Sequence, residues 1–384
     1  MGPFRSGGAG VIGVYVHVPY CTVRCSYCDF YLVAGPGRDP GAYVDALCNE
    51  ISAVEAPLLG RPADAVHFGG GTPSLLQPAQ VGRVLDRIRA VFAIPSGAEI
   101  ALEANPEDVD AARLRGWIAA GVNRLSVGVQ SLEDDLLRMM RRPHTAIEAM
   151  DAIAAARRAG VSSLGADLIL GLPGQTRART LNGIAQVVDL GVDHVSLYLL
   201  EVHSRTRLGR EVALGRRLPM DEETASALYE EAAGLLECRG FEHYEISNFA
   251  RPGHRSRHNS KYWTDQDYLG FGPSAHSYVS GRRWSNAPRL DDYLARGGVG
   301  TRRIEDDPSR SARAAEALVA GLRLTEGVVL ALLRGRYGAD FSSPPPEAVA
   351  DLVGAGLLEG DHEHLRLTRR GRLLSNEVFE RLVP

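Results

Sequence analysis

A repeated alternation of short apolar runs and longer amphipathic stretches constrains the fold of this chain more than any other feature. Between residues 11 and 200, each run rich in β-branched or apolar residues is followed by a loop and then by a stretch with 3.6-residue periodicity. This alternation is typical of βα units, in which helical crossovers join the strands of a parallel sheet. The runs that we expect to form strands are 11–18, 64–68, 99–103, 124–130, 164–170 and 194–200.

The stretches between these runs carry the signals of helices and of helix ends. Helical periodicity extends over 40–54, 78–91, 108–120, 146–159 and 178–190. Gly121, Gly160 and Gly191 each follow such a stretch, where glycine readily adopts the left-handed conformation that ends a helix. The pattern predicts an α/β fold, a partial (β/α)6 barrel, with the polar and glycine-rich motifs at the C-terminal ends of the strands.

The chain after residue 200 departs from this alternation. Asp221 is suited to cap a helix that extends to about Cys238, and a short strand is expected at 243–246. A long polar stretch rich in aromatic residues then extends to about residue 293. In the last segment we expect a helix at 311–323, a proline-rich break at 344–346, a helix at 347–355, a hairpin at 357–367 and a final helix.

The order of helix, helix and hairpin in the last segment resembles a small winged-helix module. That shape alone would suggest DNA binding, but the segment has no lopsided basic face and a fold does not determine a function, so we expect a packing domain. We therefore divide the chain into a flexible tail at 1–10, a partial barrel at 11–235, a connecting segment at 236–300 and a winged-helix-like α+β domain at 301–384.

Charge and hydrophobicity argue against two classes of partner. The formal net charge of −4 lacks the basic excess with which nucleic-acid-binding proteins displace counterions, so no nucleic acid is expected. No apolar run reaches the roughly 18 to 20 residues of a membrane span, and residues 1–10 lack the apolar core of a secretory signal. We expect the protein to act in the cytoplasm.

Three of the five cysteines follow the first expected strand within eight residues. Cys21, Cys25 and Cys28 have the spacing CxxxCxxC, which in a reducing compartment indicates a metal or redox site and not a disulfide framework. Three thiolates can hold three irons of an iron–sulfur cube and leave the fourth iron open for chemistry. A zinc site completed by His17 or by a distant residue is the alternative that the spacing leaves open.

The cysteine motif resembles that of the radical S-adenosylmethionine superfamily. The aromatic-rich segment 27–30 and the lead-in 15–21, which reads YVHVPYC, are similar to the oxygen-independent coproporphyrinogen III oxidases and their relatives. The resemblance extends from about residue 11 to the C-terminus. It implies a radical-SAM barrel with a [4Fe-4S] cluster whose open iron is chelated by the amino and carboxylate groups of S-adenosylmethionine. It also implies that the reduced cluster cleaves the sulfonium to a 5′-deoxyadenosyl radical.

The same resemblance assigns the contacts of S-adenosylmethionine. The turn at 67–73 contains three glycines, which let the backbone approach a ligand closely, and the family uses this turn near the methionine end of the cofactor. Further polar residues follow later strands, whose C-terminal ends converge on one mouth. The implied contacts are Tyr15, Tyr27, Gly70, Gly71, Thr72, Glu103, Gln130, Arg142 and Asp167.

Two features separate the members of this group. The oxidases resemble CxxxCxxCxC and have an N-terminal extension, whereas this chain has Phe30 at the last position and about ten residues before the first expected strand. The segment 258–263 reads HNSKYW and matches the HNxxYW motif of the HemW haem chaperones. The match implies haem contacts by His258, Asn259, Tyr262 and Trp263. The alternative is a hydrogen-bonded loop histidine beside ordinary aromatic packing.

The resemblance implies a haem chaperone of the HemW type. Such a protein would bind haem, the cluster and S-adenosylmethionine, accept an electron from a flavodoxin or ferredoxin, and transfer haem to an acceptor haem protein, including a membrane-associated one. The alternative is a coproporphyrinogen III dehydrogenase that decarboxylates propionates to vinyl groups, and a zinc-stabilised binding module is a third hypothesis. The loop at 201–208 departs from the Glu-Pro-Gly-Thr type of the family, which puts its contacts in doubt.

Overall fold

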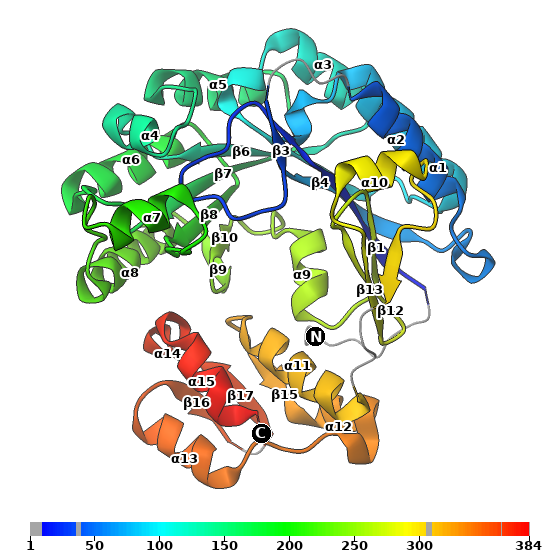
Figure 1. Ribbon diagram of the computed structural model, residues 1–384. Helices are drawn as coiled ribbons and strands as arrows, with labels where there is room; N and C mark the ends of the chain where they lie inside the picture. The colour runs from blue at the N-terminus through cyan, green and yellow to red at the C-terminus, as the bar shows by residue number, and fades with distance from the viewer. Residues whose placement is uncertain (1–9, 36–39, 305–308, 362, 384) are drawn as a thin grey trace.

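A curved, mostly parallel sheet forms the larger part of the molecule (Figure 1). The computed structural model describes residues 10–35, 40–304, 309–361 and 363–383. Within these residues the main sheet has twelve strands in the order β14-β13-β12-β11-β1-β4-β5-β6-β7-β8-β10-β9. They are β1 Ile12–Val18, β4 Ala63–Gly70, β5 Glu99–Ala104, β6 Arg124–Gln130, β7 Ser163–Leu170, β8 His194–Leu199, β9 Glu242–Glu245, β10 Asn248–Ala250, β11 Tyr268–Phe271, β12 His276–Val279, β13 Arg282–Asn286 and β14 Arg302–Ile304. A separate pair joins β2 Tyr20–Cys21 to β3 Val33–Ala34.

The sheet is an open barrel. Strands β11, β1, β4, β5, β6, β7 and β8 pair in parallel, and antiparallel strands extend the sheet at both edges. Because β14 and β9 are the two ends of the strand order, the sheet does not close on itself. The predicted α/β partial barrel is therefore confirmed, and each of its six predicted strands is present within two residues at either end.

Helices cover the outer, convex face of the sheet (Figure 1). Two of the predicted caps illustrate their ends: Gly121 adopts φ = 111° after α3, and the Asp221 carboxylate accepts a 2.8 Å hydrogen bond from the Thr224 backbone N–H at the start of α8. The helices of this part are α1 Gly41–Ser52, α2 Pro78–Val91, α3 Ala111–Ala120, α4 Asp134–Met139, α5 Ala146–Arg158, α6 Arg177–Asp189, α7 Arg207–Ala213, α8 Glu222–Cys238, α9 Arg257–Trp263 and α10 Leu290–Ala295.

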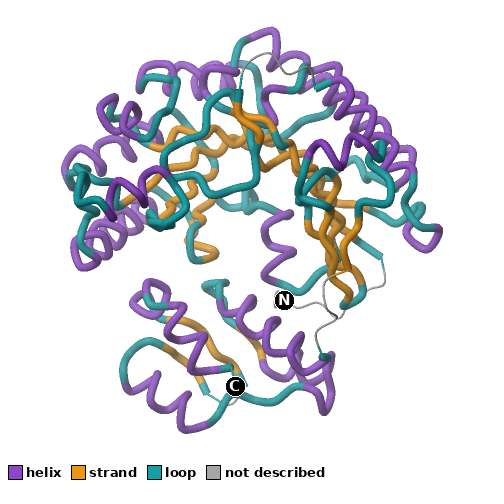
Figure 2. The backbone as a smooth tube through the Cα atoms, in the orientation of Figure 1, coloured by secondary structure: helices purple, strands orange, loops and turns teal. Residues whose placement is uncertain are grey.

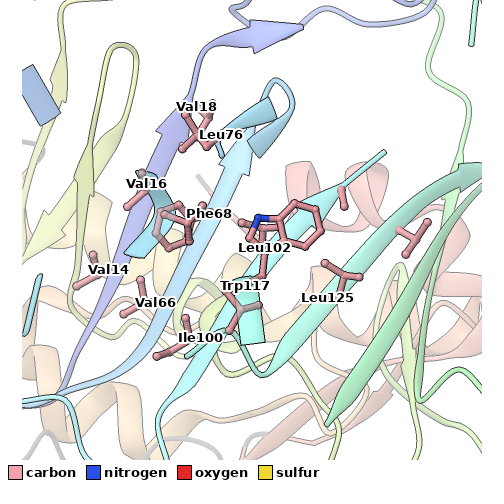
Figure 3. Close-up of a cluster of buried hydrophobic side chains, with 14 of the residues drawn as sticks. Val14, Val16, Val18, Val66, Phe68, Leu76, Ile100, Leu102, Trp117 and Leu125 are labelled. Atoms are coloured by element: carbon pink, nitrogen blue, oxygen red, sulfur yellow. The ribbon is translucent and has the colours of Figure 1, made fainter. Parts of the chain in front are cut away.

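The period-two alternation of the strands divides their side chains between a core and an interior. On β1, Val14 and Val16 point outward and pack with Phe68 of β4 in the core that Trp117 of α3 completes (Figure 3). Tyr15, between the two valines, lies on the opposite face and stacks on His67 of β4. The outer face thus binds the helices by burial of apolar area, and the inner face is left for polar and aromatic side chains.

The segment at 236–300, which we expected to connect two domains, contributes strands to both edges of the sheet. Strands β9 and β10 extend it beyond β8, and β11, β12 and β13 extend it beyond β1. Helix α9 lies against the starts of the strands, because a Cβ at Gly13 of β1 would come within 2.8 Å of the Lys261 side chain. Backbone N–H groups at the start of α9 also donate to the carboxylate of Glu99, the first residue of β5.

The C-terminal residues form a smaller unit (Figure 2). This unit has a hydrophobic core of its own. It contains α11 Arg310–Leu322, α12 Leu330–Tyr337, α13 Pro346–Gly354, α14 Arg369–Leu373 and α15 Ser375–Leu382, with a sheet of β15 Val328–Val329, β17 His364–Leu367 and β16 Leu358–Gly360. The predicted hairpin and helices are confirmed, whereas α12 and β15 were not predicted. Backbone hydrogen bonds from Ile246 to Arg323 and from Thr325 to Tyr244 join this unit to the barrel.

Two further points concern the predicted tail and membrane spans. The tail was predicted at 1–10, and residues 1–9 of it lie outside the described part of the chain. Among the described residues, no helix has both the length and the hydrophobicity needed to cross a bilayer.

Candidate functional site

The three cysteines lie in one loop above the C-terminal ends of the parallel strands. Cys21 is the last residue of β2, and Cys25 and Cys28 follow in the loop, where the Cys28 backbone N–H donates to the Cys25 carbonyl. The Thr72 hydroxyl donates to the Cys21 sulfur at 3.2 Å, and an Arg142 Nη1 lies 3.6 Å from the Cys25 sulfur. All three thiols are free and unbridged. The loop therefore brings the three sulfur atoms to the same end of the barrel.

Burial disfavours the thiolate forms of Cys21 and Cys28. Loss of solvent raises the pKa of the Cys21 thiol to about 11, although the Thr72 hydroxyl opposes the shift, and burial also raises the pKa of Cys28. Among the described residues, no three His, Cys, Asp or Glu side chains converge on a position for a single metal ion. The thiolates of an iron–sulfur cube each bind a different iron, so a cube needs ligands that are farther apart.

A cavity of about 430 Å³ adjoins the cysteines, and we call it the cysteine cavity. Its wall combines the cysteine loop with residues from the C-terminal halves of four successive parallel strands, β4 to β7. The predicted contacts that line it are Tyr27, Gly70, Gly71, Thr72, Glu103, Gln130, Arg142 and Asp167. This volume falls in the range of small-molecule sites, about 300 to 1,000 Å³. The structure thus gathers eight of the nine residues that the sequence assigned to S-adenosylmethionine.

The glycine turn after β4 lets the backbone pass close to the cysteine loop. A Cβ at Gly71 would lie 2.6 Å from the Tyr20 carbonyl oxygen, and one at Gly70, which has φ = 109°, would lie 2.7 Å from the His17 ring. Contacts this short exclude any larger residue at either position. The turn therefore holds Thr72 against Cys21 at the edge of the cavity.

Two charged groups at the wall of the cysteine cavity are available to a polar ligand. Arg142 donates through Nη2 to the Asn105 Oδ1 at 2.7 Å and to the Gly128 carbonyl at 2.9 Å, but its buried Nε has no partner within the described residues. Burial raises the pKa of the Asp167 carboxyl to about 6, against hydrogen bonds from Ser196 and Ser126. The cavity thus presents an arginine and a carboxylate, which suit the carboxylate and the amine or hydroxyls of a zwitterionic cofactor.

Tyr15 is the exception among the predicted contacts. It is not among the residues that line the cysteine cavity, and it lies on the inner face of β1 with its ring stacked on His67 at a centroid distance of 6.0 Å. His67 Nε2 lies 2.9 Å from Glu103 Oε1, and Glu103 lines the cavity, so these two residues connect Tyr15 to it. We therefore place Tyr15 behind the wall of the cavity.

Three polar residues of the cavity wall were not singled out from the sequence. Asn105 follows β5, Ser126 lies on β6 and Tyr198 lies on β8, and all three line the cysteine cavity. The alternation of side chains along the strands could have identified two of them. Ser126 is the register partner of Glu103 on the neighbouring strand. Tyr198 lies two residues after Ser196, which is the register partner of Asp167, and therefore points to the same face. Asn105 has no such signal, because it lies beyond the end of its strand.

The residues of the HNxxYW motif lie on α9 and face different surroundings. His258 is 1% exposed, stacks on Tyr15 and on His67, and its Nε2 lies 2.8 Å from the Tyr262 hydroxyl. Burial lowers its pKa well below the usual value. The Trp263 ring lies under the guanidinium of Arg323, at 4.4 Å. Asn259 lines none of the cavities described here.

The loop at 201–208, whose contacts the sequence left in doubt, packs against the cysteine loop. Arg205 pairs with the Asp29 carboxylate at 2.5 Å, His203 lies 3.6 Å from the same carboxylate, and the Leu208 backbone N–H donates to the Ser26 carbonyl. Glu201 and His203 also line the cysteine cavity. The loop therefore covers one side of the site despite its unusual sequence.

Comparison with known proteins agrees with this architecture. The family model for the radical SAM superfamily matches residues 15–205, and the model for the HemN C-terminal domain matches residues 309–374. The solved structure of coproporphyrinogen III oxidase (HemN) from Escherichia coli, described as a radical SAM enzyme, has a TM-score of 0.83 and 25% identity over 99% of this chain and 92% of that chain. The fold and the cysteine loop thus define a radical SAM protein with a HemN-type C-terminal domain.

Curated relatives narrow the class further. The haem chaperone HemW of Bacillus subtilis (strain 168) is 35% identical over 95% of this chain and 97% of its own, and that of Lactococcus lactis subsp. lactis (strain IL1403) is 32% identical over 96% of each. The chain belongs to the HemW family of radical SAM proteins.

Membership in the radical SAM superfamily implies a [4Fe-4S] cluster and S-adenosylmethionine, and the residues present fit both. Three free thiols share one loop, and the adjoining cavity holds an unpartnered buried donor at Arg142 and a carboxylate at Asp167. The glycine turn leaves the backbone open to a ligand at the cavity edge. The zinc-stabilised module that the cysteine spacing left open is not needed to explain this donor set.

Proposed function

We propose that this protein is a haem chaperone that binds haem beside a [4Fe-4S] cluster with S-adenosylmethionine and delivers the haem to an acceptor protein in the cytoplasm. The proposal depends on one observation: two cavities adjoin each other at the cysteine loop. The cysteine cavity and a second cavity rich in tyrosine share Asp29 and Phe30 as lining residues. Relatives named haem chaperones, similar over nearly their whole length, support the same function.

The residues of the cysteine cavity have separate tasks in this proposal. Cys21, Cys25 and Cys28 hold the cluster, and Arg142 and Asp167 face the polar groups of S-adenosylmethionine. When bound, the cluster and S-adenosylmethionine supply one-electron reductive chemistry. The remaining wall residues orient the cofactor and exclude water from it.

The surface beside Cys25 and Cys28 suits an acidic electron donor of the flavodoxin or ferredoxin type. A cavity of about 490 Å³ opens there, and Arg24, Arg141, Arg207 and Arg210 are exposed at its rim. A cluster of cations accelerates encounter with a partner of opposite charge. We therefore propose that electrons enter through this surface.

Haem would contact residues of α9, as the HNxxYW match implies. Tyr262 lines both the tyrosine-rich cavity and a smaller cavity of about 280 Å³ beside α11, whereas Trp263 lines the smaller cavity and not the tyrosine-rich one. His258 and Asn259 have no exposed position at either cavity wall. Of the four motif residues, Tyr262 is thus the best placed to touch a ligand at the cysteine loop.

The similarity to HemN favours one alternative, an oxygen-independent coproporphyrinogen III oxidase. The fold is compatible with it, because the HemN structure matches over nearly the whole chain. Phe30 argues against the oxidase. It occupies the position of the last cysteine in the CxxxCxxCxC pattern of the oxidases, so this chain has an exposed phenyl ring there in place of a thiol.

Two assays on anaerobically reconstituted protein separate the functions. We expect haem to bind at about one per chain and to pass to an added apo-haem protein, seen as the Soret band of the acceptor. We expect no vinyl porphyrin product from coproporphyrinogen III with S-adenosylmethionine and a reductant. Formation of that product at many turnovers per chain would overturn the chaperone proposal in favour of the oxidase.

A further inference from the structure

Each sulfur of the cysteine loop has a hydrogen-bond donor from another part of the chain or from the loop itself. The pairs, donor first, are the Thr72 hydroxyl and Cys21, the Arg142 guanidinium and Cys25, and the Phe30 backbone N–H and Cys28. Cysteine sulfurs that bind iron are thiolates, and hydrogen bonds to them are one of the factors that set the potential of an iron–sulfur cluster. Two of the three donors are side chains, so their effect can be tested by substitution.

The Thr72 hydroxyl is directed at the Cys21 sulfur, which lies 3.2 Å away. Thr72 precedes the short 3-10 helix η2 Pro73–Leu75, but among the described residues its side chain makes no hydrogen bond that caps this helix. The residue is 4% exposed, so bulk water does not compete for the hydroxyl. Because a β-branched side chain has few rotamers, this hydrogen bond is held in one geometry.

The Arg142 guanidinium is fixed between Cys25 and the wall of the cysteine cavity. Its Nη2 donates to Asn105 Oδ1 at 2.7 Å and to the Gly128 carbonyl at 2.9 Å. These two bonds orient the planar group and leave Nη1 3.6 Å from the Cys25 sulfur. The Tyr27 hydroxyl interacts with the same sulfur. A fixed positive charge at this distance favours additional negative charge on the sulfur.

The direction of the effect on a bound cluster follows from its charge. An added electron makes the cluster and its thiolate ligands more negative, so a donor to a thiolate is bound more strongly after reduction than before it. The effect is large where water is excluded, because a low local dielectric strengthens hydrogen bonds. Both Cys21 and Thr72 are buried. These donors therefore make the cluster easier to reduce.

We propose that Thr72 and Arg142 set the reduction potential of the cluster through the sulfurs of Cys21 and Cys25. The step that they favour is transfer of one electron from a flavodoxin or ferredoxin to the cluster, with no bond made or broken. This inference rests on the cluster of the proposed function. It gives a second task to two residues that the family resemblance implied only as contacts of S-adenosylmethionine. Both act through a cysteine and are positioning residues.

A redox titration of the reconstituted protein, followed by EPR and recorded without S-adenosylmethionine, tests the Thr72 contact. We expect Thr72→Val, which keeps the shape and removes the hydroxyl, to lower the ratio of reduced to oxidised cluster at a fixed potential at least about threefold. Thr72→Ser, which keeps the hydroxyl, should restore the wild-type ratio. Ser126→Ala is the matched control, because its hydroxyl belongs to the same cavity wall but donates to Asp167 at 3.1 Å.

A second pair of variants tests the Arg142 contact through a different sulfur. We expect Arg142→Met to lower the same ratio, again without S-adenosylmethionine present. Arg141→Met should lower it less, because Arg141 is an exposed arginine that lines the neighbouring cavity beside Cys25 and Cys28. The pair keeps the inference testable if Thr72→Val does not assemble a cluster, which iron and sulfide analysis would reveal.

The outcomes separate this inference from the function beneath it. Wild-type potentials in both Thr72→Val and Arg142→Met would overturn the inference, since a purely structural role changes stability without moving the potential. Equal shifts in Thr72→Val and Thr72→Ser, or in Arg142→Met and Arg141→Met, would overturn the role of the corresponding hydrogen bond. Failure of the wild type to assemble a cluster would overturn the proposed cluster site as well. Shifted potentials in a protein that transfers no haem would overturn the chaperone proposal alone.

Discussion

At the residue scale, Asp167 combines burial with a place at the cysteine cavity. Its pKa is raised to about 6 by burial, so the carboxylate form prevails above pH 6 and the neutral form below it. If the carboxylate is the form that contacts S-adenosylmethionine, binding weakens as the pH falls through 6. We expect affinity to be roughly fourfold lower at pH 5.5 than at pH 7.5, because only about a quarter of the carboxyl is ionised at the lower pH.

Anaerobic calorimetry at the two pH values measures this effect. The Asp167→Asn variant is the control, because it should bind more weakly than wild type and show little pH dependence in this range. An equal pH dependence in wild type and variant would assign the titration to another group.

Arg142 has a buried Nε without a hydrogen-bond partner in the described part of the chain, so this atom is available to a ligand. We expect Arg142→Met to weaken binding of S-adenosylmethionine about 10- to 100-fold, because a charge-assisted hydrogen bond contributes about 1.5 to 3 kcal/mol. Arg138→Met, at an exposed position of the nearby α4, should leave binding unchanged. Equal affinity of Arg142→Met and Arg138→Met in equilibrium dialysis would contradict the contact.

At the element scale, the sequence predicted the strands that alternate with capped helices and, outside that alternation, a strand at 243–246, which is present as β9 Glu242–Glu245. Strand β1 and strands β4 to β8 of the barrel were predictable because glycines such as Gly121 end the preceding helices and the apolar runs are continuous. Strands β11 to β13 were not predicted, since their stretch mixes tyrosines, glycines and arginines without a clean period. These strands carry Tyr268 and His276, so the tyrosine-rich cavity that both residues line could not be predicted from the sequence.

The candidate site shows the same division. Residues of the C-terminal halves of the strands, such as Glu103 and Asp167, line one cavity because the ends of parallel strands converge. Tyr15 lies apart from them, because a position on a strand does not tell whether its side chain reaches the mouth of the barrel or stays behind its wall. The burial of His258 could not be predicted from the sequence either, because it depends on the packing of α9 against β1 and β4.

Helix α9 depends on one buried carboxylate at its start. Glu99 accepts hydrogen bonds from the backbone N–H groups of Arg257 and His258 and lies 3.5 Å from the Arg124 guanidinium. We expect Glu99→Gln to lower the free energy of unfolding by about 2 to 4 kcal/mol, because it leaves the buried Arg124 without a countercharge. Urea denaturation measures the change.

A double variant provides the control for this prediction. Arg124→Met combined with Glu99→Gln should recover part of the loss, since the uncompensated charge is then removed. If the double variant loses more free energy of unfolding than the two single variants lose together, the pair does not act through charge.

At the scale of the whole molecule, Asp265 links the barrel to the C-terminal unit. It adopts φ = 52° and its carboxylate accepts hydrogen bonds from Tyr278 of the barrel and from Tyr337 and Arg336 of α12. We expect Asp265→Ala to destabilise the C-terminal unit by about 2 to 4 kcal/mol, because it removes these partners and places alanine in a left-handed conformation.

Differential scanning calorimetry measures this destabilisation as a lower transition temperature of the C-terminal unit. Asp265→Asn should have a smaller effect, since asparagine tolerates the left-handed conformation and keeps an acceptor oxygen. Identical scans for wild type and Asp265→Ala would show that this residue does not couple the two units.

The central claim is that three thiolates of one loop hold a cluster whose remaining iron takes S-adenosylmethionine. The EPR spectrum of the reconstituted, reduced protein, recorded before and after addition of S-adenosylmethionine, tests it most directly. The account predicts a [4Fe-4S] signal that changes on addition, is abolished in Cys25→Ser and is retained in Cys238→Ser, whose thiol is exposed and remote from the loop in sequence. An unchanged spectrum on addition, or a full signal in Cys25→Ser, would contradict it.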